Sequence, residues 1–451
     1  MTLAAAAPLL TRGGLAGRGD RRPAPPPRIV HMGAGAFHRT HQAWFTARAH
    51  DADAWGIAAF TGRSPRVADQ LTAQDGLFTL VERGPDGDRF AVIDSLCEAR
   101  PAAAHGRFIE LLTAPETAIV TLTVTEAGYH LDAHGELDLR DDDVAADVAV
   151  LRDVGAPTAL RTPAARLTDG LHRRHHAGAG PIAVVSCDNI PDNGRTLQRA
   201  VAAIAAACGW DCADWRVSFV TTSVDRITPH TTEADLQLVT RATGWRDEAA
   251  VIAEPFADWV LCGDFPAGRP AWEDAGARFV DAVEPYEQRK LLMLNGGHLV
   301  LAFRGLLRGH DTVASAMADT VCRDALERFW DEAARVVHPA AEPAVYRAAL
   351  VERFQNARIA HRLSQIAVDT ATKLRLRVVP VIAAERAAGR DATASLTVIG
   401  DWATGIRTGA FGDGADVETL ADALLPGLHP ADAALITGAL AAPHDSKETP
   451  T

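Results

Sequence analysis

The sequence predicts an α/β protein in which a Rossmann-type domain with a mostly parallel sheet is followed by a mostly α-helical domain. Two observations predict this fold class. In residues 28–283, short apolar runs alternate with helical segments, which is the pattern of βαβ crossovers. In residues 284–441, apolar residues recur with a period of about 3.6 and runs of β-branched residues are few. The change of pattern predicts a domain boundary at residue 284.

The strand-like runs of the first domain come at regular intervals along the chain. They occupy residues 28–32, 56–60, 78–81, 118–124, 182–186 and 217–221. Helices are expected between several of them, at residues 40–50, 156–176 and 194–207. Because parallel strands must be joined by crossovers, the order predicts one mostly parallel sheet covered by helices.

The second domain and the two ends of the chain are simpler. Helices are predicted at residues 286–305, 312–337, 344–355, 361–388 and 416–425. Residues 1–27 are rich in Ala, Gly, Arg and Pro, and this composition predicts a disordered leader. The leader is not expected to be a signal peptide, because it lacks a basic n-region and a clear cleavage site. The polar residues 442–451 are expected to form a disordered tail.

Composition narrows the class of protein. The charge is 45 − 58 = −13, which argues against a nucleic-acid partner and favours a soluble cytoplasmic protein. No apolar run approaches the ~20 residues that span a bilayer, so no membrane partner is expected. Six scattered cysteines, without two pairs at zinc-ligand spacing, indicate free thiols and no metal site.

Lysine is rare in this chain and therefore informative. Only Lys290, Lys373 and Lys447 occur, so 45 − 3 = 42 of the basic residues are arginines. An ammonium group can lose its proton near neutral pH, whereas a guanidinium effectively cannot. Lys290 therefore stands out as a candidate for proton transfer, although solvated lysines that survived by chance would look the same.

A glycine loop follows the first strand. Gly33 and Gly35, between a strand and a helix, form half of a dinucleotide fingerprint, and His38 replaces its third glycine. The acid expected after the second strand is also absent. Arg63 or Arg66 could hold a ribose 2′-phosphate, so NADP stays open beside NAD. A glycine turn that binds nothing, with both arginines in a solvated loop, is the structural alternative.

The segment from Lys290 to His298 carries polar residues on one predicted helix. At about 3.6 residues per turn, Glu287, His298 and Asn295 lie roughly 60°, 80° and 140° from Lys290. Lys290 could accept the proton of a secondary alcohol while hydride leaves, and Asn295 could donate to the alkoxide. His298 could orient the substrate. Gly296-Gly297 would permit close approach of a ligand. A solvated polar stripe is the alternative.

A second candidate follows the strand at residues 182–186. Asn189 lies at the carboxyl edge of the predicted parallel sheet, where ligands bind, and could supply another amide to the alkoxide. An Asx turn with a helix cap would account for Asp192 and Asn193, and it accounts for Asn189 less well.

These segments together resemble the polyol-specific long-chain dehydrogenases, the family of mannitol 2-dehydrogenase and fructuronate (mannonate) reductase. The resemblance covers roughly residues 28–385. It rests on seven blocks in order: RIVHMGAGAFHRTHQ from Arg28, TLTVTEAGY from Thr121, SCDN from Ser186, VDRITP from Val224, GRPAW from Gly268, Lys290 to His298, and QIAVDTATK from Gln365.

The resemblance implies a Rossmann-type domain, a helical domain, a site between them and no metal. It implies that Lys290 is the general acid/base and that Asn189 and Asn295 are alkoxide-stabilising amides. His298 would orient the substrate, and Glu287 would line the proton path to solvent. The cofactor would contact Gly33, Gly35, Ala36, Phe37, Arg39 and Arg63, and the substrate would contact Lys373, Gln365 and Arg362.

Two departures bear on the substrate. Mannitol-type members carry Arg where this chain has Gln365, and the string from His361 to Asp369 is more similar to the fructuronate reductases. The usual Asp-Gly-Ser-x-Lys reads Asp369-Thr-Ala-Thr-Lys373, and the region after Pro380 is short. A uronate carboxylate needs a cation, which Lys373 or Arg362 could provide.

Three functions follow from these patterns. The first is an NAD(P)-linked fructuronate reductase that interconverts fructuronate and mannonate. The second is a polyol dehydrogenase that acts on a hexitol or pentitol. The third is a cofactor-binding protein without catalysis, against which Lys290, Asn189, Asn295 and His298 argue. The partner is a small molecule in the first two, and the sequence leaves a monomer and a dimer open.

Overall fold

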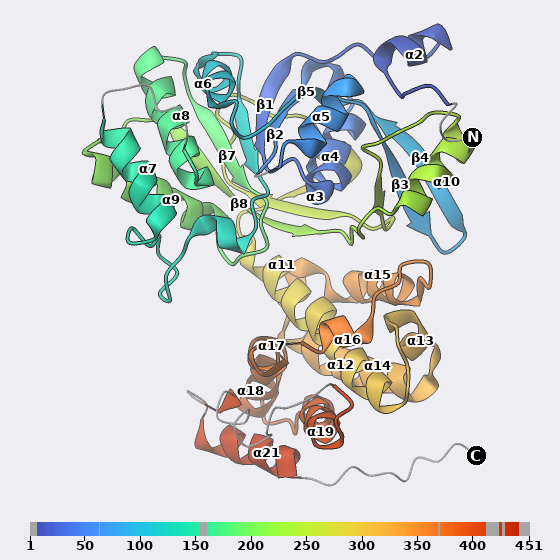
Figure 1. Cartoon of the computed structure of the whole chain (residues 1–451). Helices are drawn as coiled ribbons and strands as arrows, with labels where there is room; N and C mark the ends of the chain where they lie inside the picture. The colour runs from blue at the N-terminus through green and yellow to red at the C-terminus, as the bar shows by residue number, and fades with distance from the viewer. Residues whose placement is uncertain are drawn as a thin grey trace. The chain divides into compact units, whose positions relative to one another are not determined.

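The computed structural model describes residues 7–62, 64–153, 160–368, 370–411, 424–425 and 429–441. The chain divides into two compact units, Met1–Val283 and Glu284–Thr451 (Figure 1). The first contains a mostly parallel sheet and the second is helical, which confirms the predicted fold class. Within the described ranges, no helix is both long and apolar enough to cross a membrane.

The main sheet of the first unit has eight strands in the order β11-β10-β8-β7-β6-β1-β2-β5. All neighbouring pairs are parallel except β10 and β8. The strands are β1 (Pro27–Met32), β2 (Gly56–Phe60), β5 (Leu96–Arg100), β6 (Ile119–Leu122), β7 (Ile182–Ser186), β8 (Val217–Asp225), β10 (Asp258–Cys262) and β11 (Arg278–Phe279).

Both faces of this sheet are buried, which explains why its strands are continuous apolar runs. Neighbouring residues of β1 divide between two cores: Ile29 packs on one face and Val30 on the other. Helices α4 (Gln42–Arg48) and α5 (Arg66–Ala73) cover the first face. Helices α6 (His105–Thr113), α8 (Pro163–Ala177) and α9 (Asn193–Cys208) cover the second (Figure 1).

One predicted strand belongs to a different sheet. β3 (Phe78–Gly84) forms a hairpin with β4 (Gly87–Ile93), and its other edge pairs with β9 (Val251–Ala253) in a three-stranded sheet. The two residues between β3 and β4 are too few for a crossover, so the pair must be antiparallel. Strands β4, β5, β9, β10 and β11 are not among the predicted strands.

The expectation of a disordered leader is wrong for residues 7–27. Helix α2 (Arg12–Gly17) begins at Thr11, whose side chain accepts the backbone N–H of Gly14 at 3.0 Å. Leu10 and Leu15 are buried against Leu77 and Trp245. Arg12 donates to the carbonyl oxygens of Asp94 and Leu96. The prediction relied on the Ala- and Gly-rich composition of the segment and did not consider Leu10 and Leu15, whose burial holds the segment in place.

The first unit also contains α3 (Ala36–Thr40), α7 (Asp142–Arg152) and α10 (Glu233–Thr243). The helix predicted at residues 40–50 is interrupted at His41, between α3 and α4. The helix predicted at residues 156–176 begins at Pro163, with Thr162 as its cap. Residues 154–159 lie outside the described part of the chain.

The second unit is built from helices around buried Phe303, Phe329, Trp330 and Trp402. Its described helices are α11 (Glu284–Arg289), the π-helical turn η4 (Lys290–Asn295), α12 (Gly296–Leu307), α13 (Val313–Ala318), α14 (Thr320–Val336), α15 (Pro343–Gln355), α16 (Leu363–Ile366), α17 (Thr370–Arg377), α18 (Val379–Ala387), α19 (Thr393–Thr408) and α21 (Pro430–Ala441).

Two predictions for the helical unit need correction. The single helix predicted at residues 312–337 is two helices, α13 and α14, which are separated at Asp319. The single helix predicted at residues 361–388 is three helices, α16 to α18, and Pro380 stands in the first turn of α18. Helices α19 and α21 were not predicted. The helix predicted at residues 416–425 and the tail at 442–451 lie largely or wholly outside the described residues.

Candidate functional site

The two glycines of the loop after β1 differ in what the chain requires of them. Gly33 has φ +103°, and a Cβ there would lie 2.0 Å from the carbonyl oxygen of Thr123. Only glycine fits this position. A Cβ on Gly35 would meet only the carbonyl oxygen of Gly33, at an ordinary 3.7 Å. The fold therefore requires Gly33, whereas the space beside Gly35 is open.

Arg39 points inward from this loop. Its Nε donates to the carbonyl oxygen of Gly35 at 3.2 Å, and its guanidinium also donates to the carbonyl oxygen of Ala249. The side chain is buried, and burial lowers its pKa to about 10. Arg39 thus fixes the glycine loop from behind. Ala36 and Phe37 are partly exposed, and Arg63 lies outside the described residues.

A pair of buried histidines lies under the loop. His38, in place of the third glycine, stacks on His31 with ring centroids 3.4 Å apart. His31 Nε2 lies 3.1 Å from the Thr123 hydroxyl, which itself donates to the Gly33 carbonyl oxygen. Since that hydroxyl has one hydrogen, His31 Nε2 must carry the proton in this bond. Burial lowers the pKa of His31 to about 3, so the ring is neutral.

This support of the glycine loop is not predicted from the sequence. Thr121 completes it, because its hydroxyl donates to His31 Nδ1 at 2.8 Å. The signal was present: His31 and Thr121 are polar residues within the apolar runs of β1 and β6, and Thr123 directly follows β6. A buried polar residue in a strand needs a partner, and the partners were one strand away.

The loop after β7 places Asn189 at the carboxyl edge of the sheet. Asn189 is exposed, whereas Asp188 before it is buried. Asn193 faces inward: its amide nitrogen donates to the carbonyl oxygens of Asp188 and Thr222, each at 2.8 Å. Asp192 makes no side-chain cap bond to α9. The alternative of an Asx turn with a helix cap is therefore wrong for Asp192 and Asn193.

The Lys290 segment is a π-helical turn and not a regular α-helix. η4 runs from Lys290 to Asn295 between two α-helices, with hydrogen bonds that span one residue more than in an α-helix. The predicted angles from Lys290 to Asn295 and His298 are consequently wrong, because they assumed about 3.6 residues per turn throughout. Such turns are frequent at functional sites. Lys290, Asn295 and Glu287 are partly exposed, and His298 is buried.

Gly296 and Gly297 serve helix packing. A Cβ on Gly296 would lie 2.9 Å from the ring of Phe329, and one on Gly297 would lie 2.9 Å from Trp330 Nε1. Both aromatic residues belong to α14. The expectation that these glycines make room for a ligand is therefore wrong, because α14 occupies that space.

The remaining predicted residues of the helical unit lie on helices around η4 and α12. His298 stacks on Phe354, with ring centroids 4.5 Å apart, and meets the edge of His361 at 4.7 Å. Helix α17, which carries Lys373, packs against η4 and α12, and α16, which carries Gln365, packs against α12. Lys373 Nζ donates to the carbonyl oxygen of Ile366 at 3.1 Å. Gln365 and Arg362 are exposed.

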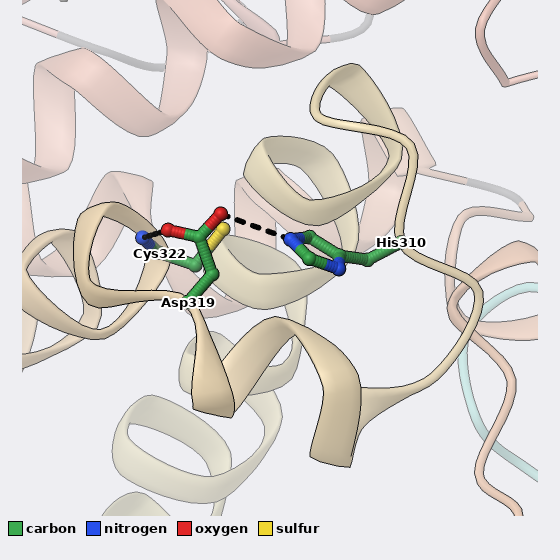
Figure 2. Close-up of side chains that lie close together, drawn as sticks. All are labelled: His310, Asp319 and Cys322. Atoms are coloured by element: carbon green, nitrogen blue, oxygen red, sulfur yellow. Dashed lines mark hydrogen bonds and ion pairs between the residues drawn. The ribbon is translucent and has the colours of Figure 1, made fainter. Parts of the chain in front are cut away.

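One cluster of possible metal ligands occurs among the described residues: His310, Asp319 and Cys322 (Figure 2). One carboxylate oxygen of Asp319 caps α14 by accepting the N–H groups of Val321 and Cys322. The other accepts from His310 at 2.9 Å and from Arg308 at 2.7 Å. A cation would have to displace Arg308. Burial raises the pKa of the Cys322 thiol to about 12. The cluster is accounted for as a helix cap.

Comparison with known proteins identifies the family. The model of the mannitol dehydrogenase Rossmann domain matches residues 27–274, and that of the mannitol dehydrogenase C-terminal domain matches residues 282–410. The chain belongs to the mannitol dehydrogenase family. It is thus an oxidoreductase of that family, as the resemblance of its motifs predicts.

Individual relatives of the mannitol dehydrogenase family match most of the chain. The D-mannonate oxidoreductase of Escherichia coli K12 is 36% identical over 78% of this chain and 74% of its own. Mannitol 2-dehydrogenase of Cereibacter sphaeroides is 34% identical over 80% and 77%. The solved ternary complex of Pseudomonas fluorescens mannitol 2-dehydrogenase with NAD and D-mannitol is 30% identical, has a TM-score of 0.76, and covers 96% of this chain and 95% of that one.

Proposed function

We propose that this protein is an NAD(P)-dependent reductase of a keto-sugar acid, which interconverts fructuronate and mannonate. The observation that carries the proposal is the pairing of an intact Lys290, Asn295 and His298 on and after a π-helical turn with Gln365 in place of arginine. The similarity to the D-mannonate oxidoreductase supports the sugar acid as substrate.

The role that we propose for each catalytic residue follows from the chemistry of carbonyl reduction. Bound nicotinamide supplies the hydride. Lys290 gives a proton to the oxygen of the ketone, or takes it from the alcohol in the reverse direction. Asn189 and Asn295 donate hydrogen bonds to the alkoxide, and His298 orients the substrate. Glu287 lines the path by which the proton passes between Lys290 and solvent.

Two further sets of residues are assigned by the proposal. Lys373 or Arg362 pairs with the uronate carboxylate, and Gln365 lies beside it. NAD occupies the loop of Gly33, Gly35, Ala36 and Phe37, where the open space beside Gly35 fits a pyrophosphate. Arg39 holds that loop, and Arg63 is assigned to the ribose, where it would also admit NADP. The reaction as proposed needs no metal.

The second candidate is a polyol dehydrogenase. The similarity to mannitol 2-dehydrogenases, one of them solved with NAD and D-mannitol, favours it. The two candidates differ in the charge of the substrate: a uronate requires a cation at its far end, and a hexitol requires neutral hydrogen-bonding groups there.

A direct assay separates the candidates. Purified protein receives fructuronate, tagaturonate, fructose or xylulose, each with NADH and with NADPH, and the absorbance of the reduced nicotinamide is followed. We expect the uronates to have the highest kcat/KM, and rates unchanged by EDTA. Preference for fructose or xylulose would establish the polyol dehydrogenase instead. Cofactor binding without turnover of any of the four would contradict both candidates.

A further inference from the structure

Thr125, in the loop after β6, has a backbone conformation that its residue type avoids. Its φ is 70° and its ψ is 160°. A side chain branched at Cβ is sterically crowded there, and this region of backbone conformation is essentially restricted to glycine. Such a conformation persists only where neighbouring groups hold it, and such residues concentrate at functional sites.

The carboxylate of Asp188 holds Thr125 in this conformation. One of its oxygens accepts the N–H of Thr125 at 2.8 Å, and the other accepts the hydroxyl of Tyr129 at 2.9 Å. A carboxylate can only accept, so the tyrosine hydrogen points to Asp188 and the hydroxyl of Ser186 donates to the tyrosine oxygen. Asp188, Tyr129 and Ser186 are all buried, which protects the bonds among these three side chains from competition by water.

The backbone of Asp188 is fixed as firmly as its side chain. Asn193 joins the Asp188 carbonyl oxygen to Thr222, from which it also accepts the N–H at 2.9 Å. The hydroxyl of Thr222 donates to the carbonyl oxygen of Ser186 at 2.7 Å. The loops that follow β6 and β7 are thus linked to each other, and to Thr222 within β8, around the residue that directly precedes Asn189.

We propose that Asp188 is a positioning residue. It keeps Thr125 in its strained conformation and fixes the backbone from which Asn189 reaches the reacting oxygen. This inference rests on the proposed role of Asn189 as an alkoxide donor. The carboxylate of Asp188 joins Thr125 to the loop that carries Asn189, so a displacement of either loop displaces the other.

The test uses full-length protein with Asp188→Ala and with the double variant Asp188→Ala/Thr125→Gly. Misplacement of a catalytic group by about 1 Å costs up to ~100-fold, so kcat of Asp188→Ala should fall roughly 10- to 100-fold while the Kd for NADH stays within about 3-fold. Glycine adopts φ 70° without strain, so the double variant should recover roughly 5-fold or more of the lost kcat and part of the lost melting temperature.

Asp147→Ala is the matched control. Asp147 is also a buried carboxylate, and it accepts the N–H groups of Arg161 at 2.8 Å and Thr162 at 2.7 Å, where α8 begins. Its loss should lower the melting temperature in the same way and leave kcat unchanged. If Asp188→Ala does not fold, Tyr129→Phe removes one of the two bonds and should lower kcat in the same direction by a smaller factor.

The inference is overturned if Asp188→Ala and Tyr129→Phe both keep the wild-type kcat, or if the Thr125→Gly change recovers neither kcat nor melting temperature. These outcomes differ from failure of the proposed function. If the wild type reduces none of the sugars, the recovery of melting temperature by glycine still tests whether Asp188 restrains Thr125.

Discussion

The glycine loop of the first unit and the π-helical turn of the second place polar groups in opposite ways. Around Gly33, polar side chains such as His31 and Arg39 are buried and bonded inward, and the space beside the backbone of Gly35 is open. At η4, the backbone is irregular and the side chains of Lys290 and Asn295 are partly exposed. A site for a cofactor's phosphates needs backbone N–H groups, and a site for proton transfer needs a side chain.

The largest loss of activity should come from substitution of Lys290 in the π-helical turn η4. Lys290→Ala should lower kcat by ~10²–10⁴-fold, because proton transfer by a positioned group contributes that much. Lys290→Arg should fail similarly, since a guanidinium keeps the charge but does not release a proton. Steady-state kinetics measures kcat, and fluorescence titration measures the Kd for NADH, which should barely change. Lys447→Ala serves as the control. A Lys290 variant with most of its activity would remove this lysine from the mechanism.

The next largest effect is on protein stability, and it should distinguish Gly33 from Gly35 in the glycine loop. Gly33→Ala should destabilise the first unit by several kcal/mol, because a Cβ would stand 2.0 Å from the Thr123 carbonyl oxygen at φ +103°. Gly35→Ala should leave the melting temperature unchanged and weaken NADH binding, because its Cβ enters only the space proposed for the pyrophosphate. Calorimetry measures the melting temperature, and fluorescence titration measures the Kd for NADH. Gly106→Ala, with no atom within 4 Å of the added carbon, is the control. Equal NADH affinity in Gly35→Ala and wild type would place the cofactor elsewhere.

The contrast also explains which features could be predicted. The central strands were predicted correctly because apolar runs on a doubly buried sheet leave a strong signal. Strand β4 of the hairpin was missed because charged and exposed residues interrupt its apolar pattern. The family could be recognised from its motifs, and the matches of both family models over residues 27–274 and 282–410 confirm it. The π-helical turn was missed because its extra residue leaves no mark in a pattern that assumes a uniform period.

The glycine pair after η4 was misinterpreted for a related physical reason. A sequence shows that Gly296 and Gly297 lack side chains, and it does not show what fills the space. In the fold, Phe329, Leu326 and Trp330 of α14 fill it. Likewise, the leader could not be predicted to pack, because Trp245, the partner of Leu10, is more than two hundred residues away in the chain.

Gly297→Ala should therefore be destabilising although alanine is the better helix former. Its Cβ would lie 2.9 Å from Trp330 and 3.0 Å from Leu326, and overpacking of this kind costs roughly 1–3 kcal/mol. Gly438→Ala, in α21 of the same unit, meets no atom within 4 Å and should gain up to ~1 kcal/mol of helix propensity. Urea denaturation of both variants should show changes of opposite sign. Stabilisation by both would mean that α12 and α14 pack less closely than described.

The smallest predicted effect concerns acid stability. Glu385 is buried and bonded to Arg390 and Arg335, which lower its pKa to about 2 against the opposing effect of burial. Because the pKa is depressed in the folded state, the stabilisation is present above about 4.5 and is lost as pH falls towards 2. The full interval corresponds to ~3 kcal/mol, and screening of two half-exposed arginines reduces the expected loss to roughly 1–2 kcal/mol.

Thermal denaturation of wild type and Glu385→Gln between pH 7 and pH 2.5 checks this prediction. The variant should melt lower than wild type at neutral pH, and the difference should shrink below pH 4.5 as the wild-type carboxylate takes up its proton. The first unit should respond earlier on acidification. His31 has a pKa lowered by burial to about 3, so the unfolded chain binds the proton first and stability declines once pH falls below 6.5. A difference in melting temperature that stays constant down to pH 2.5 would show that the charge of Glu385 does not stabilise the protein, because the loss of that charge on acidification would then have no effect.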